Sequence, residues 1–459
     1  MKIIVLNGSN KGQMSVTLQY VHYIQKILPH HELKILHVAQ KINALEKDGA
    51  AFQEVISQVR AADGVLWAFS VKYFFVHAAY KRFIELIGEQ GAADAFRGKY
   101  TAVLSTSIHF CDHLAHNYIH AICDDLDMKH VGAFSAEVED LLKETGRKNL
   151  TLFAENFLAA IENNTPTSKS YQPLTQPKFD YVAARPVGQV DVGRQKVVLV
   201  TDMEPDQVNL ASMVERFRAS FSPGIEVVNL HDLDIKGGCL GCLRCGYNNQ
   251  CAYEGKDEYI DFYNNQLKPA EVIVFAGAMK DRFLSATWKM FFDRSYFNTN
   301  TPSLMGKQFG FIISGPLSQN QNLQQFLEAF VQFQRSNLTG WVTDEESDSA
   351  KIDALLQALA ERLLRFSASG YIEPPTFVGL GGAKIMRDTI WNGLSRSVFQ
   401  ADYQAYQKLG LDDFPRQNLK TAAMNAVMMS LLKIPGFRKN FTSQMKERMI
   451  QPYQKILQN

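Results

Sequence analysis

The chain has 459 residues, which at about 150 residues per domain corresponds to roughly three domain-equivalents. It carries 48 Lys plus Arg against 47 Asp plus Glu, so its net charge of +1 provides no large single-sign field to attract nucleic acid or an anionic membrane. A hydrophobic content of 46% with 21% charged residues excludes a disordered or fibrous chain.

Neither an export signal nor a membrane span is expected from the sequence. The opening segment, MKIIVLNGSN, holds too short an apolar run for a signal peptide. The longest charge-free stretch near the C-terminus, Thr421 to Leu432, is shorter than the about 20 apolar residues that a spanning helix needs. We therefore expect a cytoplasmic protein.

Short apolar runs alternate with stretches of helical periodicity along the first third of the chain. The predicted strands are Ile3 to Leu6, Lys34 to Val38, Val65 to Phe69, Tyr100 to Ser105 and Val131 to Phe134. The predicted helices lie near 15–28, 51–61, 77–88, 115–125 and 147–162. Continuously apolar strands are typical of a parallel sheet that is buried on both faces. We predict a doubly wound, five-stranded parallel sheet, which binds ligands at the carboxyl ends of its strands.

The loop after the first strand, NGSNKGQMSVTLQ, has the features of an anion site. Ser9, Ser15 and Thr17 offer hydroxyl groups, two glycines allow close backbone approach, and a helix begins there with free N–H groups. The spacing is neither a Walker A nor a GxGxxG pattern, so we expect a simple phosphate group at this loop. The alternative is that the serines only cap the helix.

The sequence contains an internal repeat. Val65 to Glu85 aligns without a gap on Ile273 to Asp293, at an offset of 208 residues and with six identities. Ile3 to Leu6 aligns on Val197 to Val200 at an offset of 194, so the second copy has gained about 14 residues between its first and third strands. The predicted domains are residues 1–165 and 195–370, joined by a linker at 166–194 and followed by a mainly helical extension at 371–459.

The second copy differs at its first loop, which reads TDMEPDQVN. Asp202, Glu204 and Asp206 would repel a phosphate, and no hydroxyl residue follows within the loop. We therefore predict that this copy has lost the anion site.

Four of the six cysteines form a C-x2-C-x2-C-x5-C motif inside the extra segment of the second copy, namely Cys239, Cys242, Cys245 and Cys251. Four cysteines are usual ligands for an iron-sulfur cubane or a structural zinc. Three thiols spaced by two residues favour the iron-sulfur cluster over zinc. The alternative is that the motif holds free thiols.

Three segments of the first copy, KIIVLNGSN, AFSVKYFFVHAAYKRFIE and GKYTAVLSTS, resemble the NADPH-dependent FMN reductase and flavodoxin-like family. The resemblance implies two tandem flavodoxin-like domains and an FMN cofactor. It implies that the FMN phosphate is held by Ser9, Lys11, Ser15 and Thr17. It implies that the flavin ring is flanked by Phe69, Ser70, Val71, Lys72, Tyr73 and Phe74, and by Thr106, Ser107 and His109. The chain departs from the family at Ser70 to Tyr73, where a proline-aromatic pair is common.

The cysteine segment in turn resembles that of the iron-sulfur flavoproteins, relatives of the same family. That resemblance implies a 4Fe-4S cluster held by Cys239, Cys242, Cys245 and Cys251.

The predicted function is an FMN-dependent oxidoreductase in which NAD(P)H or a ferredoxin-like donor reduces the flavin and electrons pass to or from the cluster. No catalytic side chain is assigned, because the cofactor carries the chemistry. One alternative is an NAD(P)H-dependent FMN or quinone reductase without a cluster, and another is a non-enzymatic flavin-binding electron carrier or sensor. A small-molecule donor or acceptor, a ferredoxin and a second copy of the chain are the expected partners.

Overall fold

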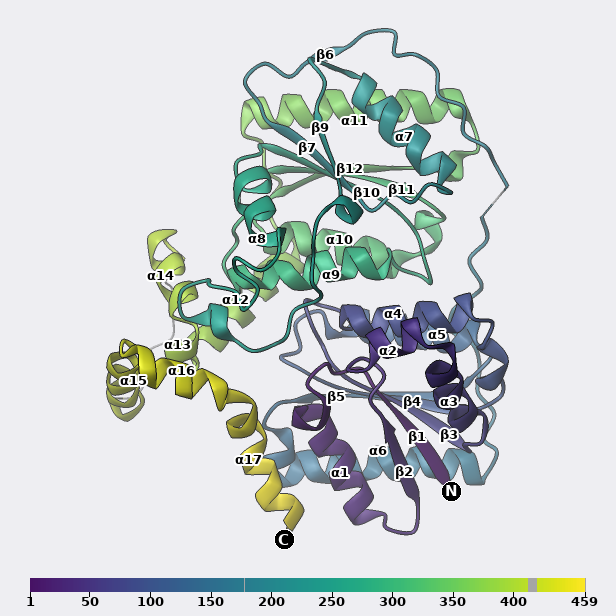
Figure 1. The fold of residues 1–459 in the computed structure, drawn as a ribbon, viewed down its shortest axis with the longest axis vertical. Helices are drawn as coiled ribbons and strands as arrows, with labels where there is room; N and C mark the ends of the chain where they lie inside the picture. Colours follow the sequence, from purple (N-terminus) through teal and green to yellow (C-terminus); the bar gives the residue numbers. More distant parts are fainter. Residues whose placement is uncertain (177, 412–418, 459) are drawn as a thin grey trace. The chain divides into compact units, whose positions relative to one another are not determined.

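The computed structural model describes residues 1–176, 178–411 and 419–458; parts of the predicted linker and extension, at 177, 412–418 and 459, lie outside the described residues. The chain divides into two compact units. Figure 1 shows the ribbon coloured along the sequence. Unit 1 comprises Met1–Pro173, Gly238–Leu243 and Val427–Asn459, and unit 2 comprises Leu174–Gly237 and Arg244–Ala426. Unit 1 is therefore assembled from three separate stretches of the chain.

Unit 1 contains a five-stranded parallel sheet in the order β2-β1-β3-β4-β5. Its strands are β1 (Lys2–Asn7), β2 (Glu32–Leu36), β3 (Gly64–Ser70), β4 (Tyr100–Ser107) and β5 (Lys129–Glu137). Its first helices are α1 (Val16–Ile27), α2 (Ile42–Lys47), α3 (Gly49–Arg60), α4 (Ala78–Glu89), α5 (Asp112–Asp125) and α6 (Glu144–Glu162). Helices α1 and α6 cover one face of the sheet, and α4 and α5 cover the other (Figure 1).

Unit 2 repeats this architecture with the strand order β9-β7-β10-β11-β12, again all parallel. Its strands are β7 (Val197–Thr201), β9 (Glu226–Asn229), β10 (Val272–Ala278), β11 (Gln308–Ser314) and β12 (Asn337–Thr343). Its helices are α7 (Val208–Ala219), α8 (Tyr259–Phe262), α9 (Ala286–Ser295), α10 (Gln321–Phe333) and α11 (Ser349–Ser369). A short parallel pair, β6 (Val190–Asp191) with β8 (Phe221–Ser222), places the end of the predicted linker in a sheet.

The predicted fold class is confirmed: this is an α/β protein with two five-stranded parallel sheets followed by helices. The apolar runs predicted the strands to within a few residues, because each central strand is buried on both faces. Within the described ranges, no helix combines the length and apolar content that crossing a membrane requires.

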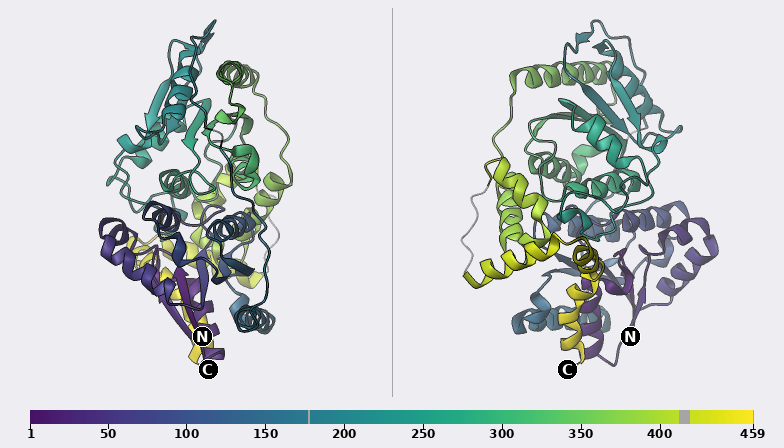
Figure 2. Two further views of the ribbon diagram at one scale, coloured as in Figure 1. Left: turned by 90° about the vertical axis from the view of Figure 1, so that its right-hand side faces the viewer. Right: turned by 60° about the vertical axis from the view of Figure 1, so that its left-hand side comes forward.

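The C-terminal extension consists of α12 (Phe377–Trp391), α13 (Ser395–Val398), α14 (Gln400–Lys408), α15 (Leu419–Leu432), α16 (Pro435–Ser443) and α17 (Met445–Gln458). Helix α17 belongs to unit 1 and lies alongside α1, as Figures 1 and 2 show in yellow and purple. Ile450 and Tyr453 are buried in the same apolar core as Tyr20, and the two tyrosine rings are 6.2 Å apart. The last helix thus completes the core of the unit that the first strand begins.

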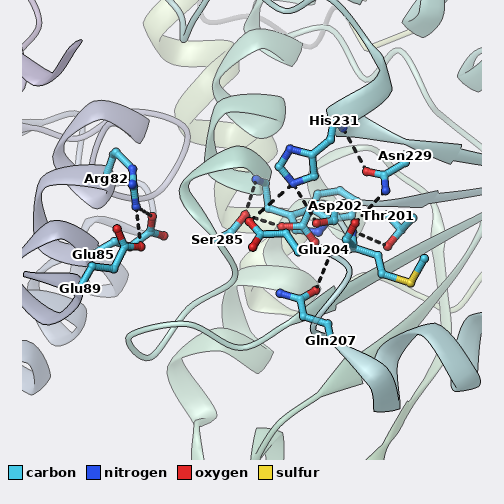
Figure 3. Close-up of polar contacts among 12 residues, drawn as sticks. Arg82, Glu85, Glu89, Thr201, Asp202, Glu204, Gln207, Asn229, His231 and Ser285 are labelled. Carbon is cyan, nitrogen blue, oxygen red and sulfur yellow. Dashed lines mark hydrogen bonds and ion pairs between the residues drawn. The ribbon is translucent and has the colours of Figure 1, made fainter. Parts of the chain in front are cut away.

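A buried ion pair recurs at the same place in both units. In α4, Lys81 Nζ lies 2.9 Å from Glu85 Oε1, with both side chains almost fully buried. In α9, Lys289 pairs in the same way with Asp293, four residues along the helix. Arg82 provides Glu85 with a second cation at 3.1 Å (Figure 3). A buried charge must be paired, so both members of each pair have to be retained together.

The packing of α17 can be tested with Tyr453→Ala. Loss of a buried aromatic ring costs about 3 to 5 kcal/mol, so we expect faster amide hydrogen exchange in α1 and a lower urea midpoint for unit 1. Gln454→Ala, an exposed neighbour on the same helix, is the matched control and should change neither. Equal exchange in the two variants would show that α17 does not support α1.

Candidate functional site

The loop after β1 lies directly against helix α4, and a glycine makes this possible. The Gly8 N–H donates to the Ala68 carbonyl at 2.8 Å, which holds the loop to β3. A Cβ atom at Gly8 would lie only 2.4 Å from the Tyr80 ring. Asn7 accepts a hydrogen bond from the Ser9 N–H at 3.1 Å, which turns the chain toward α1. Residue 8 must therefore lack a side chain for the loop to close.

Ser15 is the most informative residue of this loop. It occupies the position before the first residue of α1, but its hydroxyl makes no capping hydrogen bond. The side chain is fully buried, and its oxygen has no hydrogen-bond partner among the described residues. An unmet buried hydroxyl costs free energy, and the N-terminus of a helix favours an anion. These features fit a phosphate oxygen and do not support the alternative that Ser15 only caps the helix.

Three other predicted residues, from three different elements, meet at the carboxyl edge of the sheet. Thr17 Oγ1 lies 3.0 Å from Ser70 Oγ and 2.7 Å from Thr106 Oγ1, and Ser70 and Thr106 are 3.2 Å apart. Because each hydroxyl can donate as well as accept, the cluster can redirect hydrogen bonds toward a polar ligand. Sequence order alone separates these residues by up to 89 positions.

Lys11 is half-buried beside this loop. Burial and repulsion from Lys72 and Lys446 lower the pKa of Lys11, Cys239 and Cys242 act to raise it, and the net pKa is about 8. The amine is therefore a cation at neutral pH that loses its charge within about one pH unit above it. Lys11, the residue predicted to hold the phosphate, is therefore positively charged at neutral pH.

The loop after β3 forms a tight turn from Lys72 to Phe75, closed by N–H to carbonyl hydrogen bonds of 2.7 and 3.1 Å. Tyr73 and Phe74 adopt positive φ angles of 45° and 66° at its tip, and both side chains are buried. Tyr73 and Phe74 therefore are not surface groups; their rings are 4.8 Å apart. Unit 2 has the same turn at Lys280 to Phe283.

The remaining predicted ring-flanking residues occupy different environments. Phe69 is fully buried, with its ring against Tyr80 and His116 in the core. Val71 continues the strand edge by donating its N–H to the Thr106 carbonyl at 3.0 Å. His109 is exposed, and its Nδ1 lies 3.0 Å from Asp112 Oδ2.

Asp112 organises the loop after β4 and was not singled out from the sequence. It accepts hydrogen bonds from Ser135 and, at 3.3 Å, from Ser107. Burial opposes the charge of Asp112, but the hydrogen bonds from Ser135 and His109 lower its pKa below the ordinary value. The sequence feature that could have identified Asp112 is its position three residues after His109, at the start of α5. An acidic side chain is favourable at a helix N-terminus.

In unit 2 a carboxylate occupies the first loop. Asp202 follows β7 at the position of Gly8, is 3% exposed, and accepts a hydrogen bond from Ser285 at the N-terminus of α9 (Figure 3). Burial raises the pKa of Asp202 to about 6. His231 lies next to it, with Nε2 3.0 Å from the Asp202 carbonyl. Glu204 is exposed, as Asp206 is.

The cysteines of the motif belong to both units, Cys239 and Cys242 to unit 1 and Cys245 and Cys251 to unit 2. The Cys239 carbonyl accepts from Asn10 Nδ2 at 2.8 Å, inside unit 1. The buried Cys245 thiol donates to the Tyr296 carbonyl at 3.5 Å, inside unit 2. Within the part of the chain that the structure describes, no three His, Cys, Asp or Glu side chains are placed to hold a metal ion. The predicted 4Fe-4S cluster therefore has no support among the described residues.

Known proteins point to the same part of the chain. Residues 1–139 match the family model of the NADPH-dependent FMN reductases. No curated protein matches the chain.

Several solved structures are similar to part of the chain. FerB, a flavoenzyme NAD(P)H:(acceptor) oxidoreductase from Paracoccus denitrificans, is 18% identical over 35% of this chain and 97% of its own, with a TM-score of 0.29. General stress protein 14 from Treponema denticola, in complex with FMN, is 15% identical over 35% and 98%, with a TM-score of 0.25. An oxidoreductase from Corynebacterium diphtheriae is 16% identical over 36% and 98%, with a TM-score of 0.30. Sequence identities and TM-scores this low add no evidence beyond the family match of residues 1–139.

The Asp202 environment gives a pH prediction. The folded state favours the protonated carboxyl, so its stabilising effect is present at about pH 4 and is lost as the pH rises through about 6. The Asp202→Asn variant has no carboxyl group to ionise, so it does not lose this stability. We expect the gain in the free energy of unfolding of the variant over the parent to be about 3 kcal/mol larger at pH 7 than at pH 4, measured by urea unfolding. Glu204→Gln, an exposed carboxylate in the same loop, should show no such difference.

Proposed function

We propose that unit 1 binds FMN at the loop between β1 and α1 and that the protein is an NAD(P)H-dependent FMN or quinone reductase that works without an iron-sulfur cluster. The observation that carries the proposal is the buried Ser15 hydroxyl at the N-terminus of α1, which has no partner among the described residues. The family match over residues 1–139 supports the same assignment independently.

Each residue of the loop has a definite role in this proposal. Ser9, Ser15 and Thr17 donate hydroxyl hydrogen bonds to the phosphate oxygens, and Lys11 supplies the positive charge. FMN supplies two-electron acceptance and donation when bound. The hydroxyls of Ser70 and Thr106 fix the side chain of Thr17.

The loops after β3 and β4 would shape the space for the flavin ring. The buried pair Tyr73 and Phe74 forms a rigid apolar wall that excludes water. Lys72 and His109 lie on the same two loops, where a polar substrate would approach. Val71 would support these loops through the hydrogen bond of its backbone N–H, and Ser107 through the hydrogen bonds of its hydroxyl. No side chain is required to transfer a proton during hydride transfer.

The cluster-containing version of this function has less support. It requires Cys239, Cys242, Cys245 and Cys251 to ligate one 4Fe-4S centre and exchange electrons with the flavin, with NAD(P)H or a ferredoxin-like donor. No three metal-ligating side chains are grouped for it among the described residues, so we assign no step to a cluster. A non-enzymatic flavin carrier would bind FMN equally well, and it differs from the proposed reductase only in turnover.

A visible spectrum of protein purified without air, with iron and acid-labile sulfide assayed on the same sample, tests the proposal. We expect flavin bands without iron or sulfide, together with oxidation of NADH or NADPH when FMN or a quinone is added. Iron and sulfide in cubane proportions would replace the proposal with the cluster-containing version. Bound FMN without any nicotinamide oxidation would support the non-enzymatic flavin carrier instead of the reductase. A protein that binds no FMN would overturn the proposed flavin site.

The role of Ser15 is tested with Ser15→Ala. Loss of one hydrogen bond to a charged phosphate costs about 1.5 to 3 kcal/mol, so the Kd for FMN should rise at least about tenfold, measured by fluorescence quenching of free FMN. Ser57→Ala, at an exposed serine of α3, is the matched control and should leave the Kd unchanged. An unchanged Kd in Ser15→Ala would place the phosphate elsewhere.

A further inference from the structure

The segment Gly238–Leu243, which carries the first two cysteines of the motif, is part of unit 1. Its Cys239 carbonyl accepts two hydrogen bonds, from Asn10 Nδ2 at 2.8 Å and from His77 Nε2 at 3.0 Å. His77 Nδ1 accepts from the Ala79 N–H, so the ring proton lies on Nε2 and points at Cys239. Asn10 belongs to the proposed phosphate loop. The cysteine segment is thereby fixed to that loop.

The turn between the two cysteines also touches Lys11. Gly241 has a φ angle of +61°, and a Cβ atom there would lie 2.9 Å from Lys11 Cε. Both thiols are close enough to interact with the charge of Lys11. A change in the shape of the turn from Cys239 to Cys242 must therefore move the Lys11 side chain.

The other cysteines of the chain have different environments. Cys111 and Cys123 are buried, and burial raises the pKa of both thiols, that of Cys111 to about 12. Cys245 is buried in unit 2. Cys239 and Cys242 are free, half-exposed and three residues apart in the chain, and both lie near the Lys11 amine. Two accessible thiols at this spacing can close to a disulfide.

We propose that Cys239 and Cys242 form a redox-active dithiol that hydrogen peroxide closes to a disulfide, and that closure loosens the phosphate loop through Lys11. In the first step one thiolate attacks the peroxide, so an S–O bond forms, the O–O bond breaks and hydroxide leaves. In the second step the other thiol attacks that sulfur, so an S–S bond forms and water leaves with the transferred proton. The two sulfurs give up two electrons, and the peroxide is reduced to two molecules of water.

Closure changes the local geometry in a defined way. In the reduced turn the Cys239 sulfur accepts from the Gly241 N–H at 3.4 Å. In the disulfide this sulfur must instead lie about 2.05 Å from the sulfur of Cys242. The intervening Gly241 then shifts against Lys11. Because Lys11 is a proposed phosphate ligand, this second part of the inference rests on the proposed function, and FMN binding should weaken about tenfold on oxidation.

The test treats full-length protein with dithiothreitol or with hydrogen peroxide and maps disulfides by mass spectrometry. We expect the peptide that carries both cysteines to lose two hydrogens. The Kd for FMN is then measured in both states, and the accessibility of Lys11 is followed by acetylation with acetic anhydride. Cys242→Ser should abolish both responses to peroxide. Cys251→Ser, which removes a half-exposed thiol of unit 2, should retain them.

Each result decides the inference. Absence of the Cys239–Cys242 disulfide overturns it, as does stoichiometric iron or zinc bound through these thiols. A disulfide that alters neither FMN affinity nor Lys11 acetylation overturns the link to the phosphate loop. If neither state binds FMN, the proposed function fails, and the disulfide together with the change in Lys11 acetylation still decides the inference.

Discussion

The absence of a side chain at residue 8 is the constraint on which the candidate site depends. Only a glycine lets the first loop lie against the Tyr80 ring and bring Ser15 to the start of α1. Unit 2 solves the same packing problem differently, because its first loop has Asp202 where unit 1 has Gly8. Gly277 stands where unit 1 has Phe69, and a Cβ atom there would lie 2.6 Å from the Trp288 ring and 3.3 Å from the Asp202 carboxyl. The first loop of unit 2 is therefore acidic, whereas that of unit 1 is the candidate anion site.

The two units resemble each other more closely in their internal packing than in their first loops. The buried pairs in α4 and α9 and the turns at Lys72 and Lys280 occur at equivalent positions in both units. These features are internal to each fold, because a buried lysine without its carboxylate would be costly. The loops after β1 and β7 are under no such restriction, and their sequences differ, with Gly8 in one and Asp202 in the other.

The fold was predictable because apolar runs and helical periodicity reflect burial, which acts over short stretches of sequence. Ser9, Ser15 and Thr17 were identified because they lie in one short segment after the first strand, where a helix begins. Contacts between distant segments were not predictable. The sequence alone does not indicate that Asn10 donates a hydrogen bond to the Cys239 carbonyl, or that Tyr453 packs in the core beside α1. These contacts depend on the path of the whole chain.

The three-part composition of unit 1 has a consequence for biosynthesis. A ribosome makes residues 1–173 first, yet helix α17, which fills the core beside α1, emerges only after all of unit 2. Until α17 is made, Tyr20 lacks the contact with Tyr453, while unit 2 is complete and can fold. Unit 1 therefore completes its core after unit 2 has been synthesised, although it contains the first strand of the chain.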